Sequence, residues 1–382
     1  MTRRGDAPAD RVAVARQVAD LVSERFFDAR RAAEWRDRHR DLPEKAAAAG
    51  SREVFADAVR RALSDLGASH TAYHTPDDPE YYGLTAIFRG PLGLAKVETD
   101  SIGADVTPEG FVRAVFAGGP AQRAGLRRGD RIVSADGAPG PFHPVRSLRG
   151  RAGRPLAITV RRSATGPEDT LRVTPRRADP QDEWLAAQRA GTRVLNVSGR
   201  RVGYLPMFCG AGERYEAAAR EAVAGGELQQ ARALVLDLRD GWGGMNPSFV
   251  TLFDPRPPVL SFRGREGGAW TELDAQWRRP LIVLVNGGTR SGKEAVAHAL
   301  RKHRVATLVG SRTAGAVLGG QCFLLRDRSL LYLAVRDVRV DGTTLEGVGV
   351  APDIAVPDAL EYSGGKDAPL EKALRIAAER SE

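Results

Sequence analysis

The fold of this chain follows from one stretch, Pro280-Leu-Ile-Val-Leu-Val-Asn-Gly-Gly-Thr-Arg-Ser-Gly-Lys-Glu294. It begins as a short apolar run, continues as a glycine-rich turn over residues 287–293, and leads into a helical pattern over residues 294–301. A buried strand, a turn and a helix in that order place Ser291 at a helix N-terminus. Unpaired backbone N–H groups gather there and favour developing negative charge. Ser291 is therefore either an N-cap, which serine prefers, or a nucleophile beside an oxyanion pocket.

Strands and helices alternate on both sides of this stretch. Residues 233–238 form an apolar run that enters a second glycine turn, 239–245, and residues 304–310 predict a further strand. Two strands, 321–325 and 329–336, are expected to form a hairpin, and residues 369–380 a last helix. This alternation predicts an α/β core with its sites at the carboxyl ends of the strands.

The preceding part of the chain has a different texture. Residues 10–66 show amphipathic helical patterns and end near a short polar turn, 67–73, that contains His70. Residues 84–175 alternate short strands with Gly/Pro turns, which is typical of a small β domain. Residues 180–191 read as a polar linker with a short helix at best.

Composition is that of a globular chain. The 382 residues are 42% hydrophobic and 27% charged, and the formal net charge is +9. The basic residues are scattered without a nucleic-acid-binding motif, and no apolar run is long enough to span a membrane. Cys209 and Cys322 lie far apart in apolar runs and are predicted to be buried free thiols. No metal-ligand spacing or cofactor motif is present, and no signal peptide is visible, which leaves the compartment open.

The middle region resembles a PDZ domain. The signature runs through Gly118-Gly-Pro-Ala-Gln-Arg-Ala-Gly-Leu126 and Arg128-Gly-Asp-Arg-Ile132. Domains of this kind bind extended C-terminal peptides by strand addition and hold the terminal carboxylate with backbone N–H groups. The resemblance implies a carboxylate loop of apolar-Gly-apolar type, which matches Leu92, Gly93 and Leu94. The alternative is a PDZ used only for packing or as a hinge.

Several motifs together resemble the family of carboxyl-terminal processing (tail-specific) proteases and the tricorn protease core. They are Gly67-Ala-Ser-His-Thr71, the PDZ insertion, Asp237-Leu-Arg-Asp-Gly-Trp-Gly-Gly244, Val285-Asn-Gly-Gly-Thr-Arg-Ser-Gly-Lys-Glu294, Val309-Gly-Ser-Arg-Thr-Ala-Gly315 and Glu346-Gly-Val-Gly-Val-Ala-Pro-Asp353. The resemblance implies a crotonase/ClpP-like α/β peptidase core with an N-terminal helical segment. The expected domains are residues 1–85 (helical), 86–177 (PDZ) and 178–382 (serine peptidase core).

The same resemblance implies which residues are catalytic. Ala316 occupies the position where the Ser/Lys branch has its lysine, so the tricorn-like Ser/His branch is expected. Ser291 would then be the nucleophile and His70 its base, while Ser69 and Glu346 would orient the imidazole. The oxyanion would be held by the N–H of Gly292 and by an N–H of the turn at Gly243 and Gly244.

The expected function is a serine peptidase that acts on protein or peptide substrates near their C-termini, with the PDZ domain recognising or gating them. Two alternatives stay open: a non-catalytic binding protein of the same fold, and a PDZ scaffold whose core is vestigial. Lys293 is discounted as the base because residues i and i+2 of a helix do not share a face. Homo-oligomerisation and substrate identity are open.

Overall fold

The structure is a computed structural model, and it describes residues 7–138, 142–263 and 269–381. The chain forms two compact units. The first contains residues 1–99 and 316–346, and the second contains residues 100–315 and 347–382. The chain therefore passes between the units after Thr99, Gly315 and Glu346.

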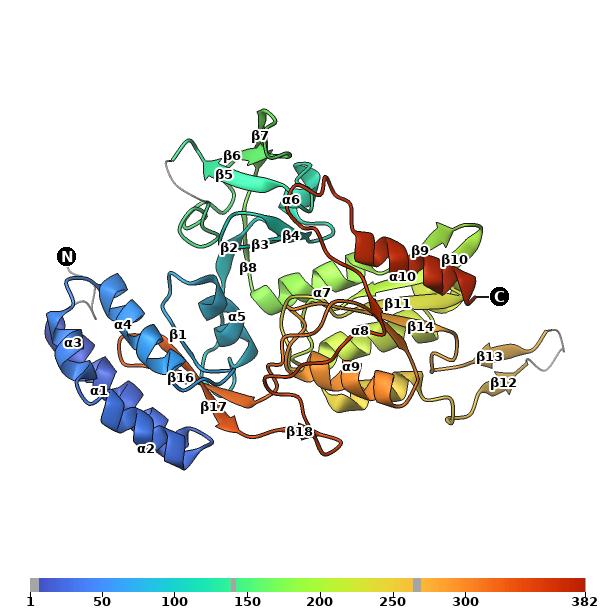
Figure 1. Cartoon of the computed structure of the whole chain (residues 1–382). Coiled ribbons are helices and arrows are strands. Elements are labelled where there is room, and N and C mark those ends of the chain that lie inside the picture. Colours follow the sequence, from blue (N-terminus) through green and yellow to red (C-terminus); the bar gives the residue numbers. More distant parts are fainter. Residues whose placement is uncertain (1–6, 139–141, 264–268, 382) are drawn as a thin grey trace. The chain divides into compact units, whose positions relative to one another are not determined.

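The first unit is a group of helices on a small sheet (Figure 1). Its helices are α1 (Pro8–Arg25), α2 (Ala29–Arg38), α3 (Leu42–Ala48), α4 (Arg52–Ser64) and α5 (Pro79–Ile87). Its sheet has the order β1-β17-β16, with β1 (Ala72–His74), β16 (Gly319–Leu324) and β17 (Leu330–Arg336), and a small ladder joins β18 (Arg339–Val340) to β19 (Thr343–Thr344).

Amphipathic patterning explains this unit. Ser51 and Asp28 begin α4 and α2 as N-caps, each accepting a hydrogen bond from a backbone N–H three residues later. The apolar faces of α1–α4 then bury residues such as Val18 and Phe55 against Leu331 and the rest of the β17 face.

The core of the second unit is a six-stranded sheet of order β20-β15-β14-β11-β10-β9. The strands are β9 (Arg193–Val197), β10 (Arg200–Pro206), β11 (Ala233–Asp237), β14 (Leu281–Val285), β15 (Thr307–Gly310) and β20 (Ile354–Ala355). The strands from β10 to β20 are mutually parallel, and β9 is antiparallel at the edge.

Helices and shorter elements flank this sheet. They are α7 (Pro180–Gly191), α8 (Glu213–Ala224), α9 (Gly292–Lys302) and α10 (Ala368–Glu379), the 3-10 helices η1 (Glu227–Gln230) and η2 (Pro247–Phe253), and a hairpin of β12 (Leu260–Phe262) and β13 (Thr271–Leu273). All residues of β11 and β14 are buried, as expected for parallel strands covered on both faces. Helix α10 packs on one face through Ala373 and Ala377.

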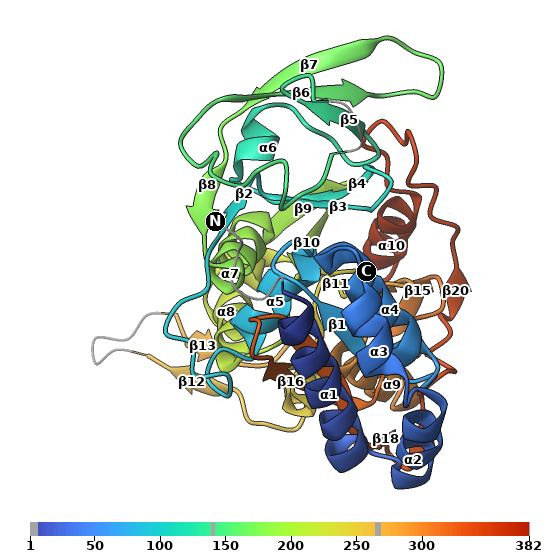
Figure 2. The ribbon, with the colours of Figure 1, turned by 90° about the vertical axis from the view of Figure 1, so that its left-hand side faces the viewer.

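The second unit also carries the small β domain. Its elements are β2 (Thr99–Ser101), β3 (Ala104–Val106), β4 (Val112–Val115), α6 (Pro120–Arg123), β5 (Arg131–Ala135), β6 (Leu156–Arg161), β7 (Glu168–Val173) and β8 (Arg176–Ala178). Strands β5, β6 and β7 run side by side as an antiparallel sheet (Figure 2). The domain has its own core around Ile102, Ile132 and Ile158.

Two segments differ from the sequence-based interpretation. Residues 180–191 form the full helix α7, capped by Asp179 and burying Trp184. The hairpin of β16 and β17 forms as expected, but it packs with the N-terminal helices because β17 pairs with β1.

Candidate active site

Ser291 lies between strand β14 and helix α9, at the N-cap position of α9. Its backbone has φ +58° and ψ −129°, whereas an N-cap residue normally has extended backbone angles. A non-glycine residue at positive φ costs about 1–3 kcal/mol, and such residues cluster at functional sites. The parallel strands bring this turn to the same edge of the sheet as the turn that follows β11.

Residues 240–244 include Gly243 and Gly244, the two glycines expected to bind the oxyanion, and we call this segment the oxyanion turn; it lies directly against Ser291. A Cβ added at Gly243 would be 2.6 Å from the Ser291 Cβ and 3.3 Å from its Oγ. A Cβ added at Gly292 would collide with the backbone of Met245, and one at Gly244 would be 2.6 Å from the Cβ of Ala211. Only glycine allows the backbone to approach this closely.

Asp240 opens the oxyanion turn and is held on three sides. It has a positive φ of +47°. Its backbone N–H donates to Asn286 Oδ1 at 3.1 Å, and its Oδ2 accepts from Asn286 Nδ2 at 3.0 Å. Its backbone oxygen accepts from Lys293 Nζ at 2.8 Å. Asn286 and Lys293 both come from the segment that carries Ser291, so that segment fixes the start of the turn.

Glu294 connects Ser291 to the loop after β15. Its side chain is fully buried. Oε2 accepts the backbone N–H of Ser291 at 3.1 Å, while Oε1 accepts from Thr313 Oγ1 at 2.6 Å and from the Gly315 N–H at 2.7 Å. The Gly315 oxygen in turn accepts the N–H of Gly347 at 2.8 Å. The carboxylate thus holds the loop that ends at Gly315 next to the turn of Ser291.

The first unit contains a hydrogen-bonded relay of Glu346, Ser69 and His70. Glu346 Oε2 accepts from Ser69 Oγ at 2.8 Å, and its Oε1 accepts the Ser69 N–H at 2.9 Å. The Ser69 Oγ lies 2.8 Å from His70 Nδ1. A third donor, the N–H of Val317, holds Glu346 Oε2 at 2.8 Å. Each carboxylate oxygen is therefore occupied, and the carboxylate cannot rotate freely.

The direction of these bonds fixes the histidine tautomer. The Ser69 hydroxyl has one proton, and it donates that proton to Glu346. Its oxygen must then accept from Nδ1, so Nδ1 carries the imidazole proton and Nε2 keeps its lone pair. His70 also has a positive φ of +55°, and its ring lies 5.4 Å from the ring of Tyr332. This tautomer is the one that a general base acting through Nε2 requires.

The structure groups the expected catalytic residues in two sets. Ser69, His70 and Glu346 lie in the first unit, and Ser291 lies in the second with the expected oxyanion residues Gly243, Gly244 and Gly292. Hydrogen bonds join the members of the first set, and close backbone packing joins those of the second.

The expected PDZ carboxylate loop is placed differently. Leu92, Gly93 and Leu94 form a hydrogen-bonded turn after α5, in the first unit and in no strand. The same apolar-Gly-apolar pattern recurs at 102–104, where Ile102 belongs to the PDZ core and strand β3 begins. Gly103 has φ +73°, and its oxygen accepts the Phe116 N–H at 2.9 Å. The second occurrence of the pattern thus precedes the PDZ strand.

Asn286, Asp240 and Lys293 were not predicted to build the site. Asn286 could have been found, because it follows a buried strand directly. The role of Lys293 leaves no signal in the sequence, since its partner is a backbone oxygen.

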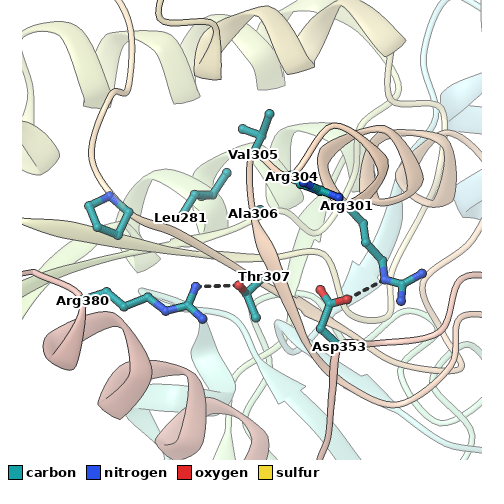
Figure 3. A pocket seen from close by; sticks show the side chains of 9 residues that line it. Leu281, Arg301, Arg304, Val305, Ala306, Thr307, Asp353 and Arg380 are labelled. Atoms are coloured by element: carbon teal, nitrogen blue, oxygen red, sulfur yellow. Dashed lines mark hydrogen bonds and ion pairs between the residues drawn. The ribbon is translucent and has the colours of Figure 1, made fainter.

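A pocket of about 290 Å³ lies at the opposite edge of the core sheet (Figure 3). Leu281 and Thr307, the first residues of two parallel strands, line it together with Arg301, Arg304 and Arg380. Ser291 follows the other end of β14, so this pocket is separate from the candidate active site.

Outside the candidate site, the described ranges of the chain contain two free cysteines but no metal-binding group and no helix suited to span a membrane. No group of three or more His, Cys, Asp or Glu side chains in these ranges is arranged to hold a metal ion. Within residues 7–138, 142–263 and 269–381, no helix has both the length and the hydropathy of a membrane span. Cys209 and Cys322 are buried free thiols, as predicted.

Comparison with known proteins gives two family matches. Residues 201–356 match the sequence model of "Peptidase family S41", and residues 111–162 match that of "PDZ domain". The first match includes Ser291, the oxyanion turn and Glu346.

The chain is also similar to individual proteases. It is 27% identical to the carboxy-terminal-processing protease of Bartonella bacilliformis over 295 residues, which cover 70% of this chain and 64% of that protein. It is 27% identical to the putative tricorn protease homolog 2 of Streptomyces coelicolor over 367 residues, which cover 90% of this chain and 30% of that protein. The chain thus spans less than two thirds of either. Identity to the carboxyl-terminal-processing protease of Synechocystis sp. is 29%, covering 81% of this chain and 73% of that protein.

Solved structures show the same fold. The photosystem II D1 C-terminal processing protease matches with a TM-score of 0.54 and 23% identity, covering 96% of this chain and 97% of that one. The tricorn protease matches with a TM-score of 0.59 and 17% identity, covering 98% of this chain and 37% of that one. The mixed α/β architecture with a PDZ domain, predicted from the sequence, is confirmed.

Proposed function

We propose that this chain, which matches peptidase family S41 over residues 201–356 and a PDZ domain over residues 111–162, is a serine peptidase with Ser291 as nucleophile and His70 as general base. The relay of Glu346, Ser69 and His70 is the observation that carries the proposal, since it leaves Nε2 of the histidine as the proton acceptor. In serine peptidases the nucleophile and the base come from separate parts of the chain, so they are identified by geometry and chemical role rather than by their positions in the sequence.

The proposed reaction forms an acyl-enzyme. The Ser291 Oγ attacks the carbonyl carbon of the peptide bond as its proton passes to His70 Nε2. The imidazolium then gives that proton to the leaving amine, and the C–N bond breaks. A water molecule, deprotonated by the same Nε2, releases the acyl group and restores the serine hydroxyl. Ser69 and Glu346 stabilise the imidazolium in both steps, because the carboxylate is linked to Nδ1 through one hydroxyl.

The negative charge that develops on the substrate oxygen requires donors beside Ser291. The N–H of Gly292, at the first position of α9, and an N–H of Gly243 or Gly244 meet this requirement. Close packing of Gly243 on Ser291 supports this role, as does the position of Gly292 at a helix N-terminus. Such donors are preorganised, so no reorganisation is needed at the moment of reaction.

We further propose that the PDZ domain recognises the C-terminus of a protein or peptide substrate by strand addition to β3. Strand β3 pairs with β4, and its other edge has no strand partner among the described residues. The backbone N–H and C=O groups of such an edge are available to an extended peptide. Replacing the free carboxylate of a peptide by an amide should then weaken binding to the full chain, which fluorescence anisotropy measures.

Labelling with a fluorophosphonate probe tests the catalytic proposal without knowledge of the substrate. The wild-type chain should be labelled, Ser291→Ala should not, and His70→Ala should be labelled roughly 10²–10⁴-fold more slowly because its general base is lost. Hydrolysis of a casein or peptide library should be lost in the same variants. A wild-type chain that is folded but neither labelled nor hydrolytic would instead support a non-catalytic binding protein of this fold.

A further inference from the structure

We propose that Lys293 is a positioning residue: from inside the core, it fixes the oxyanion turn (residues 240–244) against Ser291 through the backbone oxygen of Asp240. The inference rests on the peptidase function proposed above. It adds a group that acts on the oxyanion-binding backbone rather than on the substrate or the serine.

The position of the ammonium group carries the argument. Lys293 is fully buried, on the first turn of α9 and two residues after Ser291. Its Nζ donates to the Asp240 oxygen at 2.8 Å. A buried lysine is normally paired with a carboxylate, and here the hydrogen-bond partner in the described part of the chain is a backbone oxygen. That oxygen belongs to a residue with strained backbone angles, three positions before Gly243.

The turn is held at its other end by a different segment. The N–H of Trp242 donates to the Phe208 oxygen at 2.8 Å, and the Gly243 oxygen accepts the Gly210 N–H at 3.0 Å. These bonds attach the turn to the segment after β10. Lys293 and Asn286 attach it instead to the segment of Ser291. Of Lys293 and Asn286, only Lys293 lies on α9, the helix whose N-cap position is Ser291. Its bond to Asp240 therefore fixes the position of the oxyanion turn relative to the serine.

The charge of Lys293 also has the right sign for this role. The charged or titratable groups that face it are Cys209, Asp237, Asp240 and Arg290. Burial lowers the pKa of Lys293 to about 8, and burial raises the pKa of the Cys209 thiol. At neutral pH the lysine is therefore a cation beside a neutral thiol. A cation bonded to the oxyanion turn favours negative charge that develops beside this turn.

A purely structural role would not call for a lysine here. A buried charge is expensive to desolvate, and well-packed apolar side chains of similar volume are often as stabilising or better. Methionine has nearly the length of lysine and no donor. Lys293→Met therefore removes the hydrogen bond and the charge while it keeps most of the packing. Lys302, at the last and exposed position of the same helix, provides the matched control Lys302→Met.

The experiment measures the second-order rate of fluorophosphonate labelling from pH 6 to 10 in the full chain. Lys293→Met should label about 10- to 100-fold more slowly than wild type at pH 7, from the loss of a charged hydrogen bond, and Lys302→Met should label at the wild-type rate. The wild-type rate should also fall as the pH rises through about 8, because the lysine loses its charge. This basic limb should be absent in Lys293→Met.

The outcomes separate this inference from the proposed function. If wild type is labelled at Ser291 and Lys293→Met keeps both the rate and the basic limb, the positioning role is refuted while the peptidase proposal stands. If wild type is folded but not labelled, the peptidase proposal is refuted, and the positioning role of Lys293, which rests on it, is refuted with it. A circular dichroism spectrum and thermal unfolding of Lys293→Met establish that a slow variant is folded. If Lys293→Met is unfolded, the labelling rate of wild type from pH 6 to 10 decides the question. A rate that does not fall as the pH rises through about 8 overturns the inference.

Discussion

A methyl group added at Gly243 should disable the oxyanion turn without unfolding the chain. In Gly243→Ala the new Cβ would lie 2.6 Å from the Cβ of Ser291 and 2.9 Å from the oxygen of Arg290, where ordinary contacts are 3.4–4 Å. The turn must therefore retreat from the serine by about 1 Å, a misplacement that costs roughly 10²-fold even away from the chemistry. Loss of one oxyanion donor lowers the rate by about 10²–10³-fold, or roughly 3–4 kcal/mol. We expect a decrease of this size.

Gly287→Ala is the matched control for this substitution. Gly287 lies in the glycine turn after β14, has an ordinary φ, and a Cβ there would meet nothing within 4 Å. The assay is the fluorophosphonate labelling rate of both variants beside wild type, with thermal unfolding to establish that each is folded. Gly287→Ala should stay within about threefold of wild type because nothing is displaced. A folded Gly243→Ala that labels as fast as Gly287→Ala would refute the assignment of this turn as the oxyanion site.

Three further variants test the relay, the buried lysine and a buried ion-pair network. In wild type, both carboxylate oxygens of Glu346 accept hydrogen bonds, one from the Ser69 N–H and the other from the Ser69 hydroxyl and the Val317 N–H. Glu346→Gln keeps the shape of the side chain but replaces one of these oxygens by an NH₂ group, which cannot accept. The labelling rate should therefore fall roughly 10²–10⁴-fold, with little change in melting temperature. In the folded protein the pKa of Lys293 is lowered from 10.5 to about 8, so between these pH values the unfolded state binds more protons than the folded state. The unfolding free energy of wild type should therefore rise by about 3 kcal/mol relative to that of Lys293→Met between pH 8 and pH 10.5. Urea unfolding of both proteins at pH 7 and pH 10 measures this, and an equal difference at both pH values contradicts it. Arg239 donates to Asp237 and Asp367 from a buried position, so Arg239→Met should lower the unfolding free energy by about 3–5 kcal/mol, whereas Arg256→Met, which breaks an exposed pair with Asp254, should leave it unchanged.

The sequence predicted the core because its signals are local. Apolar runs that are buried throughout β11 and β14 read as parallel strands, and glycine turns followed them directly. Helix α7 was missed because its buried side chains are partly polar. The buried Glu183 side chain accepts hydrogen bonds from Arg176 and Ser101, and the buried Gln188 side chain donates to the Tyr215 oxygen. Polarity at these two positions marks internal hydrogen bonds rather than exposure to solvent.

Contacts between distant segments could not be predicted. The pairing of β17 with β1 joins residues more than 250 positions apart. The sequence of neither strand indicates which strand it pairs with. The roles of Ser69, His70, Glu346 and Ser291 stay predictions. They rest on the resemblance and on the geometry within each of the two sets. The sequence assigns the carboxylate loop to residues 92–94 from the apolar-Gly-apolar pattern alone. The structure shows that the same pattern at 102–104 adjoins the PDZ strand β3, so the assignment to 92–94 stays a prediction.

Unfavourable features at the proposed catalytic positions support a catalytic core over a vestigial one. His70, Asp240 and Ser291 all have positive φ, and each is a proposed base, turn residue or nucleophile. Such backbone angles cost about 1–3 kcal/mol each in non-glycine residues, and the lowered pKa of Lys293 adds a further unfavourable term. A protein that used this fold only to pack or to bind would gain stability by relaxing them. Strained backbone angles at a proposed nucleophile and in the turn packed against it are what a stability–activity trade-off produces at an active site.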